Sequence, residues 1–343
     1  EEAISLCRQK RFHEVLEKCR YTSLDDEEEY SIDVIQPEKI EFKQNSYEDG
    51  ENSIISFPEF LLLVLDVCTG GEQPASHYQP DKLIEKFDAL KTYFTAGEFY
   101  EKMLYYRLLL DYYTIRRDIK DGQGNYSLIL KGPKDDSDKL KQYQSMLYVS
   151  TEAFYNWLKP YLRKLEQDEL HSCAEMLAFL KKEDNERHSI LPARKDLSYK
   201  ASGNIRYWFW RLDYYLWEQR STFFNEEEQK IVEHYVFRRN RSIEHLHPQD
   251  ESHNEEWEEE AVHSFGNLAM ISQSFNSQQS NDHIQIKFAR IHEQISNKSL
   301  QSIKMFLMCK LADFNYQNWT MKLAKEHENE MIEFLERSFY ISD

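Results

Sequence analysis

Beyond residue 203 the chain contains one proline and one glycine, and both belong to the same group of polar residues. Pro248 lies in the stretch Ile243–Gln249 (IEHLHPQ), and Gly266 opens the stretch 266–268 (GNL). Proline fixes φ and lacks an amide donor, whereas glycine reaches backbone conformations that are closed to other residues. The surrounding sequence is otherwise compatible with helix. The pattern therefore predicts a specific non-helical structure built around these residues.

The composition favours a mainly α fold. The chain has 343 residues, of which 41% are hydrophobic and 30% are charged, with only 9 glycines and 8 prolines. Scarce glycine and proline disfavour turn-rich sandwiches and barrels, and the length is sufficient for two domains. We predict a mainly helical domain over residues 1–195 and a second helical domain over residues 200–343, joined near Pro192–Gly203.

The cysteines and the hydropathy indicate the cellular compartment. Five cysteines are scattered without a CxxC pair, which is typical of a reduced, cytoplasmic protein without a zinc ribbon. The apolar run Phe60–Leu65 is too short to cross a bilayer, so no membrane association is expected.

The net charge of −18 argues against a surface that binds nucleic acid over its whole area, because phosphate binding needs local positive potential. A local basic groove remains open. Its candidates are Arg206 with Arg211, and Arg238–Arg241 (RRNR), which leads into the polar motif. Within that stretch, Arg239 and Arg241 are the expected phosphate contacts.

The polar motif is expected to form two strands and a helix. Arg241–Leu246 is the predicted first strand, which Pro248 ends. Residues 266–271 are the predicted returning strand and carry Asn267, which lies 22 positions after His245. Residues 274–291 are predicted to form the following helix.

These residue types fit the hydrolysis of a phosphodiester. A neutral histidine such as His245 can activate water, because its pKa lies near the operating pH. The amide oxygen of Asn276, at the predicted start of the helix, is a hard ligand suited to Mg²⁺ or Mn²⁺. Glu244 and His245 are adjacent, so in a regular strand they point to opposite faces and reach one metal only where the strand bends.

The aromatic stretch Arg206–Leu212 (RYWFWRL) allows two interpretations. It is expected to be a buried helix face, and the alternative is a platform on which bases stack. Further histidines near the motif show no regular ligand spacing, although they leave an adventitious Zn²⁺ or Ni²⁺ site open. They are His247, His253, His263 and His283.

The motif resembles the C-terminal nuclease domain of the GmrSD-type restriction proteins (DUF1524), which belong to the His-Me finger, or HNH, nucleases. That family's pattern is approximately I-E-H-I-x-P-Q, G-N-L-x-L, N-S-x-x-S-N and a lysine. This chain has Ile243–Gln249, 266–270 (GNLAM), Asn276–Asn281 and Lys287, and Trp319 falls where the family tends to keep a tryptophan. The resemblance covers about residues 205–340.

The resemblance implies a ββα-metal motif embedded in the helical domain. It implies His245 as general base, Asn276 as metal ligand, Glu244 as second ligand, and Asn267 as a brace for the hairpin. Lys287 is the remaining expected contact to nucleic acid. The implied cofactor is a divalent metal, with Mg²⁺ or Mn²⁺ preferred and Ni²⁺ or Zn²⁺ as alternatives.

The implied function is metal-dependent cleavage or nicking of DNA, in restriction of foreign, modified phage DNA. Residues 56–62 (SFPEFLL) and 81–87 (DKLIEKF) also resemble the middle of such proteins. Full-length relatives begin with a nucleotide-using DUF262 domain marked by a D-G-Q-Q-R motif that this chain lacks. That domain is therefore an expected partner in cis, and a homo-oligomer remains open. The alternatives are an idle helical interaction module that keeps the nuclease fold, and a nuclease that cleaves RNA.

Overall fold

The computed structural model describes residues 1–20, 50–119, 126–150, 153–238, 241–249, 257–272 and 284–340. The described chain is mainly α, as predicted, with two small antiparallel sheets. It forms two compact units. Unit 1 comprises residues 1–137 and 154–172, and unit 2 comprises residues 138–153 and 173–343.

The compact units divide the chain differently from the predicted boundary. Helices α6 (Asp138–Val149) and α8 (Cys173–Arg187) lie in unit 2, because α6 packs against both α8 and α9 (Ile205–Glu218). A compact unit need not coincide with a domain defined by sequence, so the domain boundary near residues 195–200 stays a prediction.

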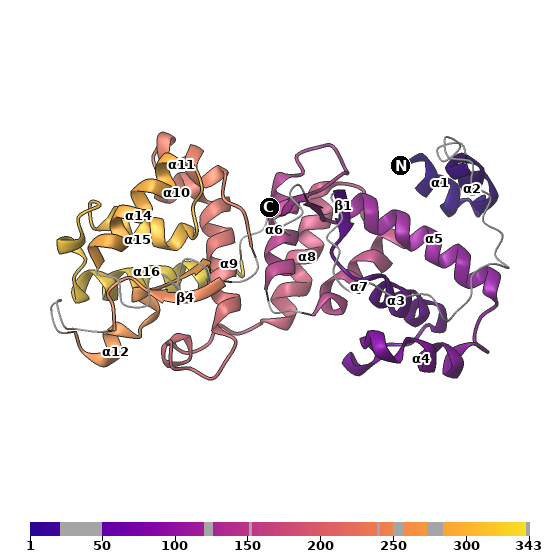
Figure 1. The fold of residues 1–343 in the computed structure, drawn as a ribbon, viewed down its shortest axis with the longest axis horizontal. Helices are drawn as coiled ribbons and strands as arrows, with labels where there is room; N and C mark the ends of the chain where they lie inside the picture. The colour runs from indigo at the N-terminus through magenta and orange to yellow at the C-terminus, as the bar shows by residue number, and fades with distance from the viewer. Residues whose placement is uncertain are drawn as a thin grey trace, which may run out of the picture. The chain divides into compact units, whose positions relative to one another are not determined.

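Unit 1 is mainly helical, and two of its helices, α3 and α5, have strong start signals (Figure 1). Ser56 and Glu59 form a capping box at α3, and Thr95 and Glu98 form another at α5, so each pair satisfies amide groups in the first turn. Gly70 ends α3 in the left-handed conformation. The helices are α1 (Glu2–Arg8), α2 (Phe12–Arg20), α3 (Phe57–Thr69), α4 (Leu83–Leu90), α5 (Ala96–Tyr113) and α7 (Phe154–Glu166), with 3₁₀ turns η3 (Ala75–Tyr78) and η4 (Pro80–Lys82).

The sheet of unit 1 is small and antiparallel. Strand β2 (Arg116–Ile119) lies between β1 (Gly50–Ser53) and β3 (Tyr126–Ile129). The segment that joins β2 to β3, residues 120–125, lies outside the described residues.

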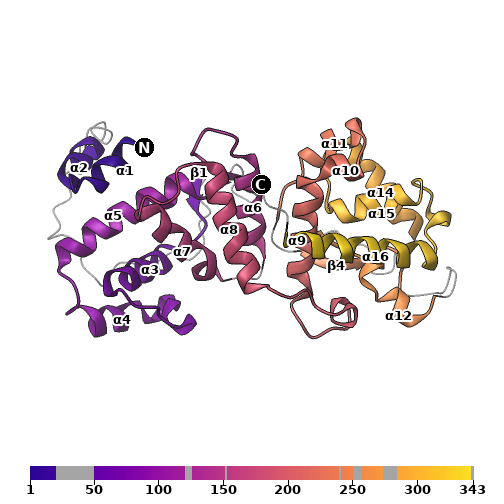
Figure 2. The same ribbon diagram turned by 180° about the vertical axis from the view of Figure 1, so that it is seen from behind.

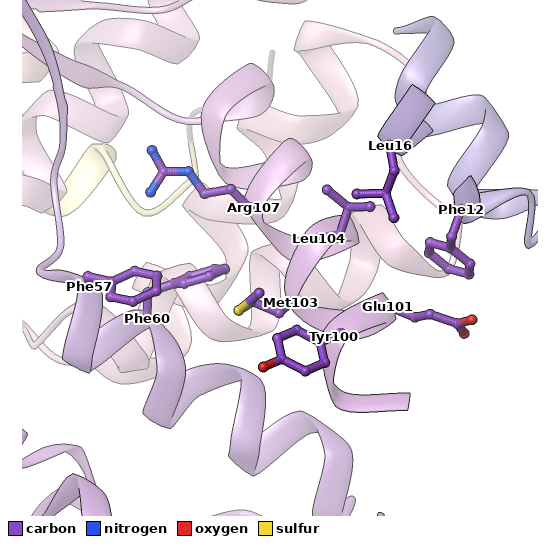
Figure 3. A pocket seen from close by; sticks show the side chains of 9 residues that line it. All are labelled: Phe12, Leu16, Phe57, Phe60, Tyr100, Glu101, Met103, Leu104 and Arg107. Carbon is purple, nitrogen blue, oxygen red and sulfur yellow. The ribbon is translucent and has the colours of Figure 1, made fainter. Parts of the chain in front are cut away.

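An apolar pocket of about 330 Å³ opens in unit 1 between α2, α3 and α5 (Figure 3). Phe60, Met103 and Tyr100 contribute to its lining, with Glu101 and Arg107 as its charged members. The lining carries no cluster of groups suited to acid–base or metal chemistry.

Unit 2 surrounds a two-stranded sheet with helices. Its remaining helices are α10 (Arg220–Phe223), α11 (Glu226–Glu233), α12 (Glu259–Val262), α14 (Ile284–Ser296), α15 (Ile303–Leu311) and α16 (Met321–Arg337), with 3₁₀ turns η5 (Arg194–Leu197), η6 (Phe265–Asn267) and η7 (Tyr316–Asn318). The strands β4 (Arg241–His245) and β5 (Leu268–Ser272) pair antiparallel. Helices α9 and α15 pack on β5, and α16 packs on η6 and α9 (Figures 1 and 2).

Helix α9 is the centre of unit 2. Every residue from Tyr207 to Trp217 is buried, and Phe209 packs against Phe265 with ring centroids 4.6 Å apart. The buried-face interpretation of this aromatic stretch is confirmed, and its rings are not displayed for stacking on bases. No helix in the described ranges is both long and apolar enough to span a membrane.

Candidate functional site

The two strands and the helix of the polar motif occur in the predicted order. His245 pairs with Leu268 at the end of the β4–β5 ladder, and the amide of Leu246 donates to the carbonyl of Asn267 at 2.9 Å. Helix α14 follows in the chain and extends past the predicted end at Ile291. One detail of the prediction is wrong, because residues 266 and 267 belong to the turn η6 and the strand starts at Leu268.

Asn267 braces the site from this turn. Its side chain is fully buried, and its Oδ1 accepts from the amide of His247 at 2.8 Å and from Trp319 Nε1 at 3.2 Å. Its Nδ2 donates to the carbonyls of His247 and Val262, at 3.0 and 2.9 Å. Two bonds to the backbone of one residue fix the chain immediately after β4. A strand position would not direct the amide there, and this explains why the turn replaces it.

Gly266 permits a close contact between the turn and α16. A Cβ at this position would lie 2.1 Å from the carbonyl oxygen of Ala324 and 2.8 Å from Cβ of Glu328. The first of these is backbone, which cannot turn away as a side chain can. The need for close approach therefore accounts for the last glycine of the sequence.

Lys304, on α15, supports the same turn from another side. Its ammonium group is buried and donates to the carbonyls of Phe265 and Leu268, at 2.8 and 2.6 Å. Burial lowers the pKa of Lys304 to about 7, and the carboxylates of Asp213 and Glu328 oppose that shift. The carbonyls on both sides of the Gly266–Asn267 pair are thus held by one amine.

His245 lies in a pocket of aromatic and polar side chains. Its Nε2 is 3.0 Å from Nδ1 of His263, and its Nδ1 is 3.0 Å from Nε2 of Gln249. The ring of Tyr199 contacts that of His245 at an angle, with centroids 4.6 Å apart, and lies nearly parallel to that of His263. The His245 side chain is 4% exposed.

This environment keeps His245 neutral. Burial, followed by the nearby His263 and Lys287, lowers the pKa of His245 to about 3. A general base works best when its pKa lies near the operating pH, so a pKa of about 3 makes His245 a weaker proton acceptor than an ordinary histidine until a bound anion raises that pKa.

Glu244 faces a different neighbour from His245, as expected for adjacent residues of a strand. Its carboxylate forms a buried ion pair with Lys287 of α14, whose ammonium group also donates to the carbonyl of His245. Lys287 is 4% exposed. The lysine thus ties the helix to the strand end, and its expected contact with phosphate stays a prediction.

The expected metal ligands offer hard oxygen donors, but the carboxylate of Glu244 is already paired with Lys287, so metal binding there would require that ion pair to open. Glu244 offers carboxylate oxygen, and Asn276 was expected to offer an amide oxygen, which together match Mg²⁺ or Mn²⁺. Among the described residues, no group of three or more His, Cys, Asp or Glu side chains is arranged to hold a metal. Asn276 lies outside those residues, so the ligand set stays a prediction.

The expected basic groove is described only in part. Arg239 lies outside the described residues, and of Arg241 only the backbone, in β4, is described. The prediction that Arg211 contributes to a basic groove is wrong. It is fully buried and paired with Asp184 at 3.1 Å, so it cannot line a groove for nucleic acid. Arg211 was a candidate for the groove because it is a basic residue close to Arg206, but it lies in the stretch of α9 in which every residue is buried.

Three residues that contact the site were given no role in catalysis or in its support by the sequence, and one of them, His263, was named only as a member of an adventitious metal site. They are His263, Tyr199 and Lys304. His263 immediately precedes the 264–268 segment, so its closeness to the strand pair could have marked it. Lys304 is a lone charge within an apolar helical stretch, 303–307 (IKMFL), which signals a buried cation with specific acceptors. Tyr199 lies in the predicted linker, and nothing in the sequence around it indicates contact with the histidines.

Residues 192–334 match the family model described as GmrSD restriction endonucleases, C-terminal domain. No curated protein and no solved structure matches the chain. The matched segment contains β4, η6, β5, α14 and α15, and thus every described residue of the site. The resemblance inferred from the motif is confirmed for this segment, which is similar to the C-terminal domain of a restriction endonuclease family.

Proposed function

We propose that this GmrSD-type C-terminal domain is an HNH, or His-Me finger, endonuclease that cleaves or nicks DNA with a divalent metal. His245 is the general base, and Glu244 and Asn276 are the metal ligands. Asn267 holds the end of the strand pair in place. The biological role is the restriction of foreign DNA, including modified phage DNA, inside the cell.

One observation carries this proposal. The buried His245 lies at the end of a strand, and His247, two residues further on, is fixed by two hydrogen bonds to the side chain of Asn267. The brace has four hydrogen bonds and the fold supports it from three helices, α14, α15 and α16. Such pre-organisation is expected where a proton acceptor must be held at a reacting atom.

The residues then divide the reaction between them. His245 Nδ1 takes a proton from a water molecule as the water oxygen bonds to phosphorus, and the bond from phosphorus to the leaving oxygen breaks. Gln249, which is exposed and lies beside Nδ1, turns aside to admit that water. The leaving oxygen takes a proton from solvent. A bound divalent metal supplies charge stabilisation on the phosphate and on the leaving oxygen.

Substrate binding depends on local charge. The whole chain is acidic, with a net charge of −18, so contacts to phosphate are expected from Arg239, Arg241 and Lys287. The pairing of Lys287 with Glu244 implies that a phosphate contact by Lys287 accompanies a rearrangement of that pair.

Cleavage of supercoiled plasmid with added Mg²⁺ or Mn²⁺ tests the proposal. His245→Ala is expected to lose cleavage by a factor of about 10² to 10⁴, because it lacks the proton acceptor. His13→Ala is the matched control, since His13 is an exposed histidine of α2 in unit 1. It should cleave at the wild-type rate. A metal titration of Asn276→Ala is expected to require a higher metal concentration for the same rate.

Cleavage by His245→Ala at the wild-type rate would remove the histidine from the mechanism. If neither wild type nor variant cleaves plasmid or modified phage DNA, the domain is an idle interaction module under these conditions. Cleavage of an RNA hairpin in preference to plasmid would keep the chemistry and change the substrate.

A further inference from the structure

A second histidine contacts the proposed base directly. His263 follows α12 as its C-terminal cap residue, and its Nδ1 lies 3.0 Å from His245 Nε2. The two rings are nearly perpendicular, at 74°, with centroids 5.1 Å apart. Both side chains are buried, at 4% and 8% exposure. A contact of this length between two ring nitrogens requires one proton between them.

The opposite nitrogen of His245 determines where that proton belongs. Gln249 Nε2 lies 3.0 Å from His245 Nδ1, and an amide NH₂ is a donor only. With Nδ1 accepting, the ring proton of neutral His245 is on Nε2, and it is donated to Nδ1 of His263. This assignment follows from the hydrogen-bond network.

The position of His263 is itself fixed. Its carbonyl accepts from the amide of Tyr199 at 3.0 Å and from Ser198 Oγ at 3.1 Å. The ring of Tyr199 lies nearly parallel to that of His263, at an interplanar angle of 16°. Two backbone-directed bonds and an aromatic neighbour therefore hold the acceptor before any substrate binds.

We propose that His263 is a positioning residue that sets the tautomer of His245. By accepting the Nε2 proton, it leaves the Nδ1 lone pair for the attacking water. When Nδ1 takes the proton from water, the Nε2–H···Nδ1 bond to His263 stabilises the resulting imidazolium. The catalytic part of this inference rests on the proposed nuclease function, whereas the tautomer does not.

Two substitutions separate positioning from packing. In His263→Asn the side-chain Oδ1 occupies about the place of the histidine Nδ1, so an acceptor for His245 remains. His263→Leu has a similar size and no acceptor. A role in packing alone predicts that both variants behave alike, or that the apolar one is the better tolerated.

The experiment measures the tautomer and the rate on the full chain. Long-range ¹⁵N–¹H spectra of histidine-labelled protein identify the protonated nitrogen of His245, whose signals are assigned by their loss in His245→Gln. For the spectra, every protein carries Gln249→Met, so that no amide donates to Nδ1 and His263 alone can set the tautomer. On that background the protein with His263 and the His263→Asn variant should show the Nε2–H form, and His263→Leu a mixture of both forms. Under single turnover with Mg²⁺, His263→Leu should be slower by a factor of about 10 to 100. Its KM and its metal titration should be unchanged, and His263→Asn should recover most of the rate.

The outcomes are distinguishable. On the Gln249→Met background, an Nδ1–H form of His245 in the protein with His263, or the same Nε2–H form in His263→Leu, overturns the proposal. Equal rate losses in the Leu and Asn variants also overturn it. If no protein cleaves DNA, the nuclease function fails, and the spectra still decide whether His263 sets the tautomer.

Discussion

Unit 2 contains two buried polar networks that differ in what burial does to their protons. In the first, Arg211 binds Asp184, Asn185 and Ser338, and Asp184 also accepts from the hydroxyl groups of Tyr143 and Tyr207. In the second, at the strand pair, His245 contacts His263 and Gln249. Both lie inside the fold, and only the second contains residues of the proposed nuclease site.

The two networks differ in the direction of their pKa shifts. Burial raises the pKa values of Tyr143 and Tyr207, and the charge of Asp184 raises them further. Burial lowers the pKa of Arg211, but its tyrosine and carboxylate neighbours raise it above its ordinary value. The two tyrosines and the arginine are therefore held in their protonated forms. His245 is held in one protonation state as well, the neutral form that lacks the second ring proton. Burial thus keeps the protons of the first network in place and leaves an accepting ring nitrogen in the second.

The largest stability effect is expected in the arginine network. Arg211→Met removes the buried cation that is hydrogen-bonded to Asp184 and leaves Arg187, at 3.6 Å, as the remaining arginine beside that carboxylate, which should lower the free energy of unfolding by about 3 kcal/mol. Urea unfolding measures this, with Arg211→Lys as the control that keeps the charge but not the planar fork. Compared with Arg211→Met, His245→Ala should lower the free energy of unfolding by less and the cleavage rate by more. An Arg211→Met protein as stable as wild type would contradict the contrast between the networks.

Lys304 should produce the next effect, as a dependence of stability on pH. Its pKa is about 7 in the fold and 10.5 ordinarily, so between these values the unfolded chain holds a proton that the folded chain does not. The free energy of unfolding should therefore rise with pH across this window, by up to about 1.4 kcal/mol per pH unit from this group. Below pH 7 both states are protonated, and the contribution becomes constant.

Urea unfolding of wild type and Lys304→Met at pH 7, 8 and 9 isolates this contribution. The methionine variant lacks the titration, so the difference between the two proteins should change with pH. Asp213 and Glu328 oppose the shift and remain in both proteins. A difference that stays constant over this range would show that Lys304 is not held with a depressed pKa.

Trp319→Phe should have the smallest effect. It removes one donor to Oδ1 of Asn267, which still accepts from the amide of His247. A loss of about 0.5 to 1.5 kcal/mol is expected by thermal unfolding, with cleavage close to the wild-type rate. Asn267→Ala removes all four hydrogen bonds of the side chain, so its losses of stability and of cleavage should both be larger than those of Trp319→Phe. Larger losses in Trp319→Phe would show that the tryptophan is the main support of the turn.

The sequence allowed the strand–strand–helix order to be predicted because proline and glycine restrict the backbone locally. Pro248 and Gly266 lie where the structure leaves helix, and β4 matches the predicted strand to within one residue. The prediction that the strand already includes Asn267 was wrong, because this part of the backbone is determined by a distant contact. Its conformation follows from contact with α16, which lies more than 50 residues later and has no local signal.

The sequence predicted those residues of the candidate site that lie close together in the motif, and it did not predict the residue that reaches the site from an earlier part of the chain. His245, Glu244 and Asn267 share one motif, so their spacing identified them. Tyr199 reaches the histidines from before α9, and only the folded chain brings it there. Arg211 shows the converse error, because a charged residue within an aromatic helix face was assigned to the surface without knowledge of its buried partner Asp184.

The contact between Gly266 and α16 also has a consequence for the order of events during synthesis. Residues 241–272 leave the ribosome well before residues 321–337, so the turn that carries Asn267 emerges without the helix that packs against it. The contact between this turn and α16 can therefore form only after α16 has been made and has docked. Until then the nascent chain carries the turn without one of its supports, and the proposed site is complete only in the finished domain.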